Sequence, residues 1–194
     1  MNIKKLFISA ALMLAAFASV ANAQEDKKYI EPLEEGVKQR IRDWQDQKFG
    51  LFIHWGTYSV TGVIESWSLD PRHIEWCYKF RPKDMSYEEY VRSYENLITQ
   101  FNPVSFDPET WAKAAKYAGM KYMVFTTKHH DGFSMFDTQQ NDYKITSDRC
   151  PFHTSPKANI AKELFDAFRA EGIMPGAYFS IADWYNDDFW WDYF

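Results

Sequence analysis

Two adjacent histidines and an aspartate form a dense group of chemically versatile side chains in the 194-residue sequence. They lie in residues 128–133, which read KHHDGF, so Lys128 alone separates His129, His130 and Asp131 from the apolar run 121–127. That run is short and rich in β-forming residues, which predicts a buried strand. In α/β folds, ligands bind at the carboxyl ends of strands. The pattern therefore indicates a ligand site. In the structural alternative, the imidazoles cap the strand and hydrogen-bond the next loop.

Two further predicted strands end in side chains of a similar kind. Residues 51–56 read LFIHWG and place His54 at the end of an apolar run. Residues 174–181 carry Tyr178 and lead to Trp184. Because parallel strands end at the same edge of a sheet, these side chains are expected to meet the histidine pair there. For a lone histidine such as His54, the alternative is a core residue with satisfied hydrogen bonds.

A loop-like stretch at 57–82 contains two carboxylate–tryptophan pairs. Glu65 lies two residues before Trp67, and Glu75 directly precedes Trp76. A carboxylate can accept hydrogen bonds from sugar hydroxyls while an indole packs against the sugar ring, although either pair could equally decorate the surface. Long ordered loops often carry function, so both pairs are candidates for the site.

Strands and helices alternate along the chain, and this alternation decides the predicted fold class. Helix starts are marked by Ser86 and by Asp107 followed by Pro108. Helices of about a dozen residues between strands imply βαβ units and a parallel sheet. We therefore predict an α/β fold, a partial (β/α)8 TIM-like barrel with only the first three or four βα units, because a whole barrel takes about 250 residues. No glycine-rich loop follows the first strand, which weakens a dinucleotide-binding alternative. Helices are expected at 36–47, 86–101, 107–119 and 158–170, and strands at 51–56, 121–127 and 174–181.

The first 23 residues have the organisation of a secretory signal peptide. Lys4 and Lys5 precede an apolar run that reaches Val20, and Ala23 ends a small-residue cleavage motif. The run is too short for a comfortable membrane span, and we predict no span later in the sequence. We expect a signal peptide at 1–23, a polar N-terminal segment at 24–35 and a truncated barrel domain at 36–194. The mature protein is expected to be periplasmic or extracellular.

The composition narrows the classes of partner. The formal net charge is −5 and becomes more negative once the signal lysines are removed, which argues against binding to nucleic acid. Aromatic residues make up 19% of the chain, and aromatic faces stack on sugars as well as filling cores. Export would permit a disulfide between Cys77 and Cys150, but their separation in sequence leaves the pairing open.

Several of these stretches, taken in order, resemble the N-terminal part of the catalytic domain of α-L-fucosidases of glycoside hydrolase family 29. They are FGLFIHWGTY at 49–58, FNPVSFD at 101–107 with Trp111, AGMKY at 118–122 and TKHHDGF at 127–133. The resemblance covers roughly residues 36–185, and its most specific parts are HWG and KHHDGF. It implies a glycosidase barrel, without a metal or other cofactor, that removes terminal α-L-fucose from glycans and glycoconjugates with retention of configuration.

The resemblance also implies roles for individual residues. The side chains expected to bind the sugar are His54, His129, His130, Glu75, Trp76 and Tyr178. Glu65 with Trp67 is the alternative to Glu75 with Trp76, and Trp184 would line the mouth of the pocket. A neutral imidazole donates from one nitrogen and accepts at the other, which suits vicinal hydroxyls.

Retaining hydrolysis needs two carboxyl groups about 5 Å apart. The resemblance places both the nucleophile and the acid/base after Phe194, so no catalytic residue is assigned within the chain. We expect this polypeptide on its own to be inactive and poorly soluble, because part of a barrel leaves strand edges and apolar surface open. The fucosyl linkage and the oligomeric state of the full-length protein stay open.

Two other functions are compatible with the same residues. One is a carbohydrate-binding module that holds a sugar without any chemistry. The other is a metal-dependent hydrolase with His54, His129, His130 and Asp131 as ligands. Consecutive residues near a strand end tend to point apart, which counts against one ion being shared by His129 and His130.

Overall fold

A computed structural model describes residues 30–70, 76 and 79–188. The predicted signal peptide, Glu75 and Cys77 lie outside these residues. The chain divides into two compact units, Met1–Gln45 and Asp46–Phe194, which are described separately. In the first unit, helix α2 (Glu35–Gln45) matches the helix predicted at 36–47. Its surface carries the exposed indole of Trp44 as well as charged side chains, and Arg42 Nη2 lies 2.9 Å from Glu35 Oε1.

The second unit is built on a three-stranded parallel sheet. Strands β1 (Gly50–Ile53), β2 (Tyr122–Lys128) and β3 (Met174–Phe179) pair in the order β1-β2-β3. In this register Phe52 lies opposite Val124, which lies opposite Gly176. The three predicted strands and their parallel arrangement are confirmed. The β2–β3 register shifts between Thr126 and Lys128, just before the histidine pair.

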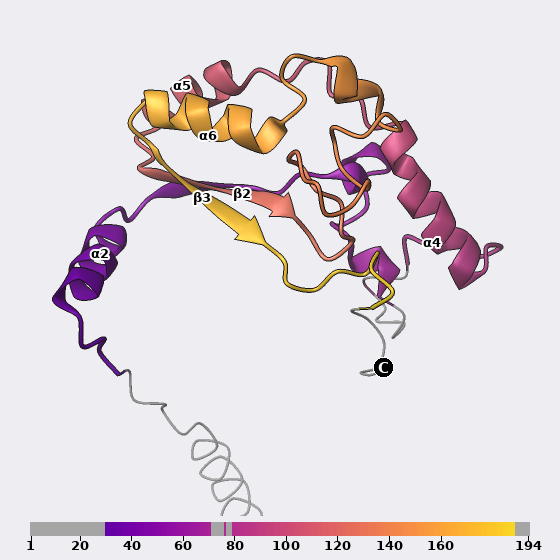
Figure 1. Ribbon diagram of the computed structural model, residues 1–194, viewed down its shortest axis with the longest axis horizontal. Helices are drawn as coiled ribbons and strands as arrows, with labels where there is room; N and C mark the ends of the chain where they lie inside the picture. The colour runs from indigo at the N-terminus through magenta and orange to yellow at the C-terminus, as the bar shows by residue number, and fades with distance from the viewer. Residues whose placement is uncertain (1–29, 71–75, 77–78, 189–194) are drawn as a thin grey trace, which may run out of the picture. The chain divides into compact units, whose positions relative to one another are not determined.

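Two helices cover one face of the sheet (Figure 1). They are α5 (Pro108–Tyr117) and α6 (Ile160–Ala170), which follow β1 and β2 respectively. As predicted, Asp107 caps α5 by accepting a hydrogen bond from the Thr110 backbone N–H, and Pro108 is the first helical residue. Beneath this layer Met123 and Phe125 of β2 are fully buried in one core with side chains from both helices. The opposite face of the sheet is more open, and Phe52 there keeps 51% of its surface exposed.

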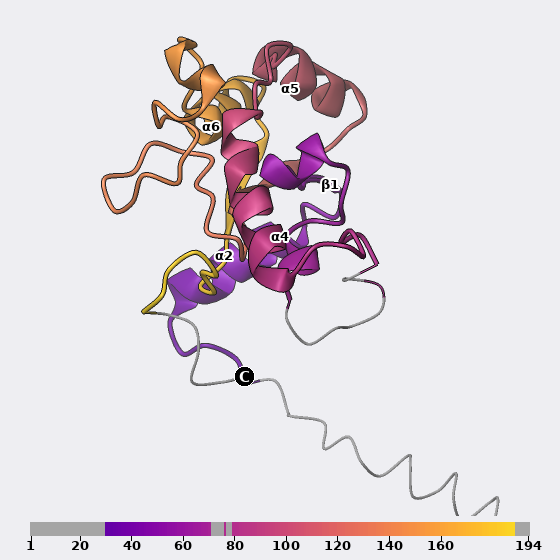
Figure 2. The same ribbon diagram turned by 90° about the vertical axis from the view of Figure 1, so that its right-hand side faces the viewer.

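A further helix lies at the end of the sheet toward which the strands run (Figures 1 and 2). The helix predicted at 86–101 is in fact α4 (Tyr87–Glu95) followed by the 3₁₀ helix η3 (Asn96–Thr99). The prediction of one continuous α-helix was therefore wrong, since the chain tightens at Asn96 into the 3₁₀ geometry common at helix ends. Ser86 and Glu89 form the capping box that starts α4.

The loops before and after these helices are ordered by short 3₁₀ turns. Between β1 and α4 lie η1 (Thr57–Val60) and η2 (Trp67–Leu69), and the long loop before α6 contains η4 (Pro151–Thr154). Cys150, at the start of η4, is a buried free thiol that contacts the Phe101 carbonyl oxygen at 3.2 Å.

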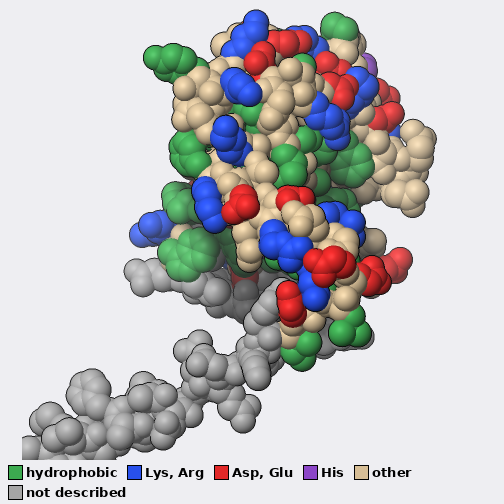
Figure 3. All heavy atoms as spheres, turned by 90° about the vertical axis from the view of Figure 1, so that its left-hand side faces the viewer, with side chains coloured by type: hydrophobic (Ala, Val, Ile, Leu, Met, Phe, Trp, Pro, Cys, Tyr) green, Lys and Arg blue, Asp and Glu red, His purple; other side chains and the backbone are tan. Residues whose placement is uncertain are grey.

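The described residues of the chain include several helices and a surface rich in charged side chains. None of their helices is long and apolar enough to cross a membrane. On the face shown in Figure 3, lysine and arginine side chains are interspersed with aspartate and glutamate, so that face carries no broad basic patch.

Candidate functional site

His54 reaches the site because of the alternation of side chains along β1. It lies two residues after Phe52 and points to the same, open face of the sheet, where its ring packs edge-on against Phe52 with centroids 5.1 Å apart. The next residue, Trp55, points to the opposite face of the sheet. Its ring packs in the helix-covered core, with its centroid 5.7 Å from that of Phe106. The HWG motif thus divides its two large side chains between site and core.

The histidine pair follows β2 and supplies two further imidazoles. The ring of His129 lies 5.1 Å from that of His54 and 4.2 Å from that of His130. Their outer contacts differ, because His129 Nδ1 is 2.5 Å from Ser66 Oγ and His130 Nδ1 is 2.5 Å from Ser180 Oγ. Each ring is therefore held in a fixed orientation by its own serine.

Tyr178 of β3 completes the strand-end group. Its ring stacks on His129 with centroids 5.9 Å apart and lies 6.0 Å from His54. Four residues predicted for the sugar site, His54, His129, His130 and Tyr178, are thus brought together from three strands. Their position at the carboxyl edge of a parallel sheet is the one expected for a ligand site.

The loop between β1 and α4 adds a carboxylate that the sequence analysis ranked second. Glu65 Oε1 lies 3.5 Å from His54 Nε2, and Glu65 Oε2 lies 3.4 Å from His129 Nε2. The indole N–H of Trp67 donates to Glu65 Oε2 at 3.0 Å. Of the two carboxylate–tryptophan pairs, Glu65 with Trp67 is therefore the one seen among the histidines.

The preferred pair is only partly visible. Glu75 lies outside the described residues, so its contact with a sugar stays a prediction. Trp76 is 44% exposed, and its ring lies next to that of Trp67, with the two centroids 6.0 Å apart. It is thus a neighbour of the site through Trp67.

Burial sets the charge of the three imidazoles. It lowers the pKa of His129 to about 3, with further lowering from the adjacent His130 and His54. Burial also lowers the pKa of His54, although the Glu65 carboxylate opposes this, and it lowers the pKa of His130. At neutral pH the site therefore presents three neutral rings beside the carboxylate group of Glu65, which suits hydrogen bonding to an uncharged polar ligand.

Asp131 does not join this group. Its side chain is buried, and it accepts hydrogen bonds from the Tyr94 hydroxyl at 2.8 Å and the Phe133 backbone N–H at 3.3 Å. Burial raises its pKa to about 6. The four-residue metal set considered from the sequence, which included Asp131 and His130, is therefore not the set that the structure assembles. The donor atoms that gather within 4.8 Å of one another belong to His54, Glu65 and His129.

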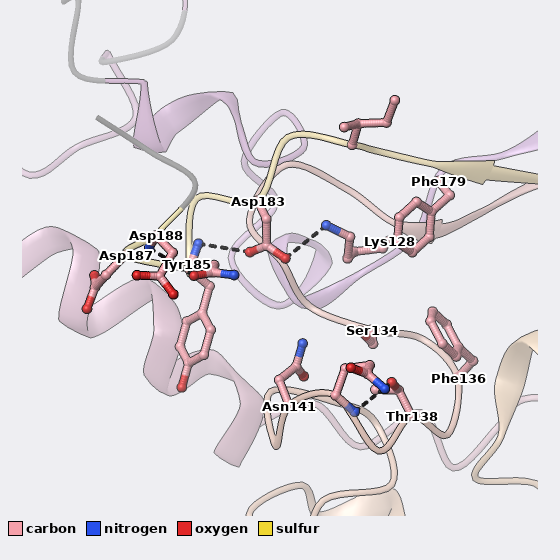
Figure 4. A pocket seen from close by; sticks show the side chains of 13 residues that line it. Lys128, Ser134, Phe136, Thr138, Asn141, Phe179, Asp183, Tyr185, Asp187 and Asp188 are labelled. Carbon is pink, nitrogen blue, oxygen red and sulfur yellow. Dashed lines mark hydrogen bonds and ion pairs between the residues drawn. The ribbon is translucent and has the colours of Figure 1, made fainter. Parts of the chain in front are cut away.

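Trp184 forms a wall beside His130. Its ring lies 5.1 Å from His130 and 5.8 Å from Trp67, and its backbone N–H donates to the His130 carbonyl at 2.6 Å. The segment is anchored one residue earlier by the ion pair between Lys128 Nζ and Asp183 Oδ2, 3.0 Å apart (Figure 4). Beyond that ion pair lies a hollow of about 860 Å³ that Phe136 and Phe179 line and to which none of the site histidines contributes.

Sequence reasoning missed the groups that orient the imidazoles. Ser66 and Ser180 contact His129 and His130, and the Tyr58 hydroxyl lies 3.2 Å from His54 Nδ1. Ser66 stands between Glu65 and Trp67, so proximity to that pair was the available signal. Tyr58 ends the motif at 49–58, so its place in that motif was the available signal, whereas Ser180 carries no distinctive pattern.

Comparison with known proteins identifies the family to which the chain belongs. The profile of the family described as alpha-L-fucosidase matches residues 16–194. The chain belongs to the alpha-L-fucosidase family, glycoside hydrolase family 29. It is 32% identical over 183 residues to the tissue alpha-L-fucosidase of Homo sapiens. Family membership agrees with the resemblance found in the sequence.

Solved structures of family members share the fold. An alpha-L-fucosidase isoenzyme from Paenibacillus thiaminolyticus is 43% identical, with a TM-score of 0.61 over 78% of this chain. A Bacteroides thetaiotaomicron fucosidase, trapped as a covalent intermediate with 2-fluoro-fucosyl fluoride, is 29% identical with a TM-score of 0.61 over 84% of this chain.

The chain spans only part of these relatives. The alignments cover 37% of the human enzyme, 31% of the Paenibacillus chain and 34% of the Bacteroides chain. The three-stranded sheet with its helices thus corresponds to about a third of a family 29 fucosidase.

Proposed function

We propose that this chain forms the fucose-binding front part of an exo-acting, retaining α-L-fucosidase. The observation that carries the proposal is the meeting of His54, His129 and Glu65 at the carboxyl edge of the sheet, in a chain of the fucosidase family. The three imidazoles are neutral and each uses Nδ1 on a protein hydroxyl, so each has Nε2 left to donate to, or accept from, a sugar hydroxyl. The carboxylate of Glu65 accepts from hydroxyl groups only.

The aromatic groups fit the remaining features of the sugar. Fucose carries an apolar methyl group and C–H faces, which pack well on aromatic rings. Tyr178 and Trp67 offer such rings beside the imidazoles, and Trp184 adds a wall next to His130. This arrangement suits a terminal α-L-fucose unit on fucosylated glycans or glycoconjugates as the substrate.

Hydrolysis itself needs more than these groups. A retaining glycosidase uses a nucleophile and an acid/base, with carboxyl groups about 5 Å apart. We place both after Phe194 in a complete enzyme, within a (β/α)8 barrel of which the present sheet is the start. The covalent intermediate trapped in the Bacteroides relative supports retention. On this proposal the chain binds fucose but does not turn it over, and its signal-like N-terminus directs it out of the cytoplasm.

Saturation-transfer NMR with L-fucose tests the binding. The purified chain is expected to transfer saturation to L-fucose and not to D-fucose, which has the same groups in mirror-image arrangement. In an L-fucose titration, Glu65→Gln should raise the dissociation constant about tenfold or more, because a hydrogen bond to a charged group contributes roughly 1.5–3 kcal/mol. The matched control is Glu109→Gln, at an exposed position in α5 whose partner is Lys157.

The outcomes separate binding from folding. Circular dichroism should show the same helical content in the parent chain and both variants. A folded parent chain that gives equal signals for the two enantiomers, or a Glu65→Gln variant that binds L-fucose like the parent, would contradict the proposed site. Release of a chromogenic aglycone from an α-L-fucoside by the chain alone would contradict the assignment of the catalytic carboxyl groups.

A further inference from the structure

We propose that His54, Glu65 and His129 bind a divalent transition-metal ion of the zinc class, and that this ion and fucose exclude one another. The exclusion rests on the fucose site proposed above; the binding of the ion does not. The site would make the protein sensitive to zinc without making zinc part of its reaction.

The spacing of the donor atoms carries the proposal. Glu65 Oε1 is 3.5 Å from His54 Nε2, Glu65 Oε2 is 3.4 Å from His129 Nε2, and one donor atom from each residue lies within 4.8 Å of the others. Around a tetrahedral zinc ion, ligand atoms at about 2.0–2.2 Å from the metal lie roughly 3.3–3.6 Å apart. Small side-chain rotations would therefore bring the three donors onto one ion.

The surroundings of the two imidazoles resemble the support that metal ligands receive. His129 Nδ1 is 2.5 Å from Ser66 Oγ, and His54 Nδ1 is 3.2 Å from the Tyr58 hydroxyl. When each Nδ1–H donates to its hydroxyl, the Nε2 lone pair is left free toward Glu65. Such outer hydrogen bonds fix the tautomer and the ring orientation of metal-bound histidines. The Trp67 indole N–H orients the carboxylate in the same way, at 3.0 Å from Glu65 Oε2.

The donor types select the class of ion. Two imidazoles and one carboxylate suit Zn²⁺, Co²⁺, Ni²⁺ and Cu²⁺, whereas Mg²⁺ and Ca²⁺ prefer oxygen ligands throughout. His129 is buried and Glu65 is about one-third exposed, so an ion can enter from the side of the carboxylate. Three protein ligands leave a fourth position for water, as in open zinc sites.

Exclusion follows from the use of the same atoms. A metal at this point occupies the Nε2 atoms of His54 and His129 and the carboxylate of Glu65, which are the groups proposed to hydrogen-bond the sugar. An ion and a fucose molecule cannot both hold them. Zinc should therefore raise the apparent dissociation constant for L-fucose, and L-fucose should raise that for zinc.

Direct metal titration of the full, tag-free chain tests the site. Isothermal titration with Zn²⁺ is expected to show one ion per chain, and Co²⁺ should give the intense visible bands of four-coordinate cobalt, while Mg²⁺ gives no heat. Glu65→Gln should weaken Zn²⁺ binding by more than the roughly 10–100-fold that loss of an outer hydrogen bond causes, and Ser66→Ala by about tenfold. The matched controls Glu109→Gln and His153→Gln should bind like the parent.

The outcomes distinguish this site from the fucose proposal. Circular dichroism identifies any variant that fails to fold, and Ser66→Ala, which keeps all three ligands, then provides the test. Zinc binding that neither Glu65→Gln nor Ser66→Ala weakens overturns the metal site, even if L-fucose binds. Zinc binding that both variants weaken supports the site, even if L-fucose fails to bind and the proposed function falls. Simultaneous binding of zinc and L-fucose overturns their exclusion.

Discussion

At the scale of single residues, Glu65 combines an unfavourable backbone with a central position. Its φ of 52° lies in the left-handed region, which is disfavoured by roughly 1–2 kcal/mol for a residue with a Cβ. That conformation presents the carboxylate between the imidazoles of His54 and His129. Strain of this kind persists where the surrounding structure enforces it and is common at functional sites.

Two substitutions at Glu65 measure that strain. Both Glu65→Gly and Glu65→Ala remove the carboxylate, so they differ chiefly in whether a Cβ is present. The free energy of unfolding should be about 1 kcal/mol higher for Glu65→Gly than for Glu65→Ala, because glycine adopts positive φ freely. Urea denaturation followed by circular dichroism provides the comparison.

A helical control shows the opposite order. At Ala114, an exposed position in α5, Ala114→Gly should lower the free energy of unfolding by roughly 0.5–1 kcal/mol relative to the parent, as glycine does inside helices. If Glu65→Gly were no more stable than Glu65→Ala, the left-handed conformation of Glu65 would not be strained.

The same residue shows where sequence reasoning ends. His54, His129 and His130 could be predicted because each follows an apolar run with strand character, and strand ends meet at one edge. Glu65 and Glu75 are both carboxylates beside tryptophan in one loop, and no periodicity tells which of them faces the histidines. That depends on the path of the loop through η1 and on the left-handed conformation of Glu65, which are properties of the folded chain.

At the scale of elements, the turn after β2 fixes the histidine pair relative to β3. Gly132 has a φ of 81°, and a Cβ there would collide with the Asp183 carboxylate and lie 2.8 Å from Tyr185 Cβ. Asp183 in turn holds Lys128 at the end of β2. The turn, the ion pair and the segment after β3 therefore form one packed unit that positions His129 and His130.

Gly132→Ala tests this packing against a matched glycine. Gly62 also has a positive φ, 70°, but no atom lies within 4 Å of a Cβ built there. Gly62→Ala should lower the free energy of unfolding by roughly 1–2 kcal/mol, from the backbone alone. Gly132→Ala should lower it by about a further 1–3 kcal/mol, because the added methyl group overpacks the site. Equal losses in urea denaturation would show that Asp183 and Tyr185 can move aside.

The elements themselves were largely predictable, and the exception is informative. Capping residues at Ser86 and Asp107 and the apolar periodicity predicted where helices begin. The end of α4 was missed, because Leu97 continues the helical spacing although the backbone has already changed to the 3₁₀ helix η3. Periodicity reports which face is buried, and both helix types can bury Leu97.

At the scale of the whole molecule, the sheet is covered on one side and open on the other. Helices α5 and α6 bury Met123 and Phe125, whereas Phe52 on the other face is half exposed. Among the described residues, β1 and β3 each pair with β2 alone, so each has a free edge. Open edges and exposed aromatic surface favour association between chains. This is why we expect the isolated chain to be poorly soluble.

Phe52→Thr tests the contribution of the open face to that behaviour. Threonine is a good strand former and removes exposed aromatic surface, so the fraction of monomer in sedimentation velocity should rise. Phe125→Thr is the matched control at a fully buried position. This substitution should instead lower the free energy of unfolding by about 3–5 kcal/mol, as large-to-small core substitutions do. The fraction of monomer should then fall below that of the parent chain. If Phe52→Thr associates as strongly as the parent chain, then the open face is not the cause, and the free edges of β1 and β3 become the surfaces to test.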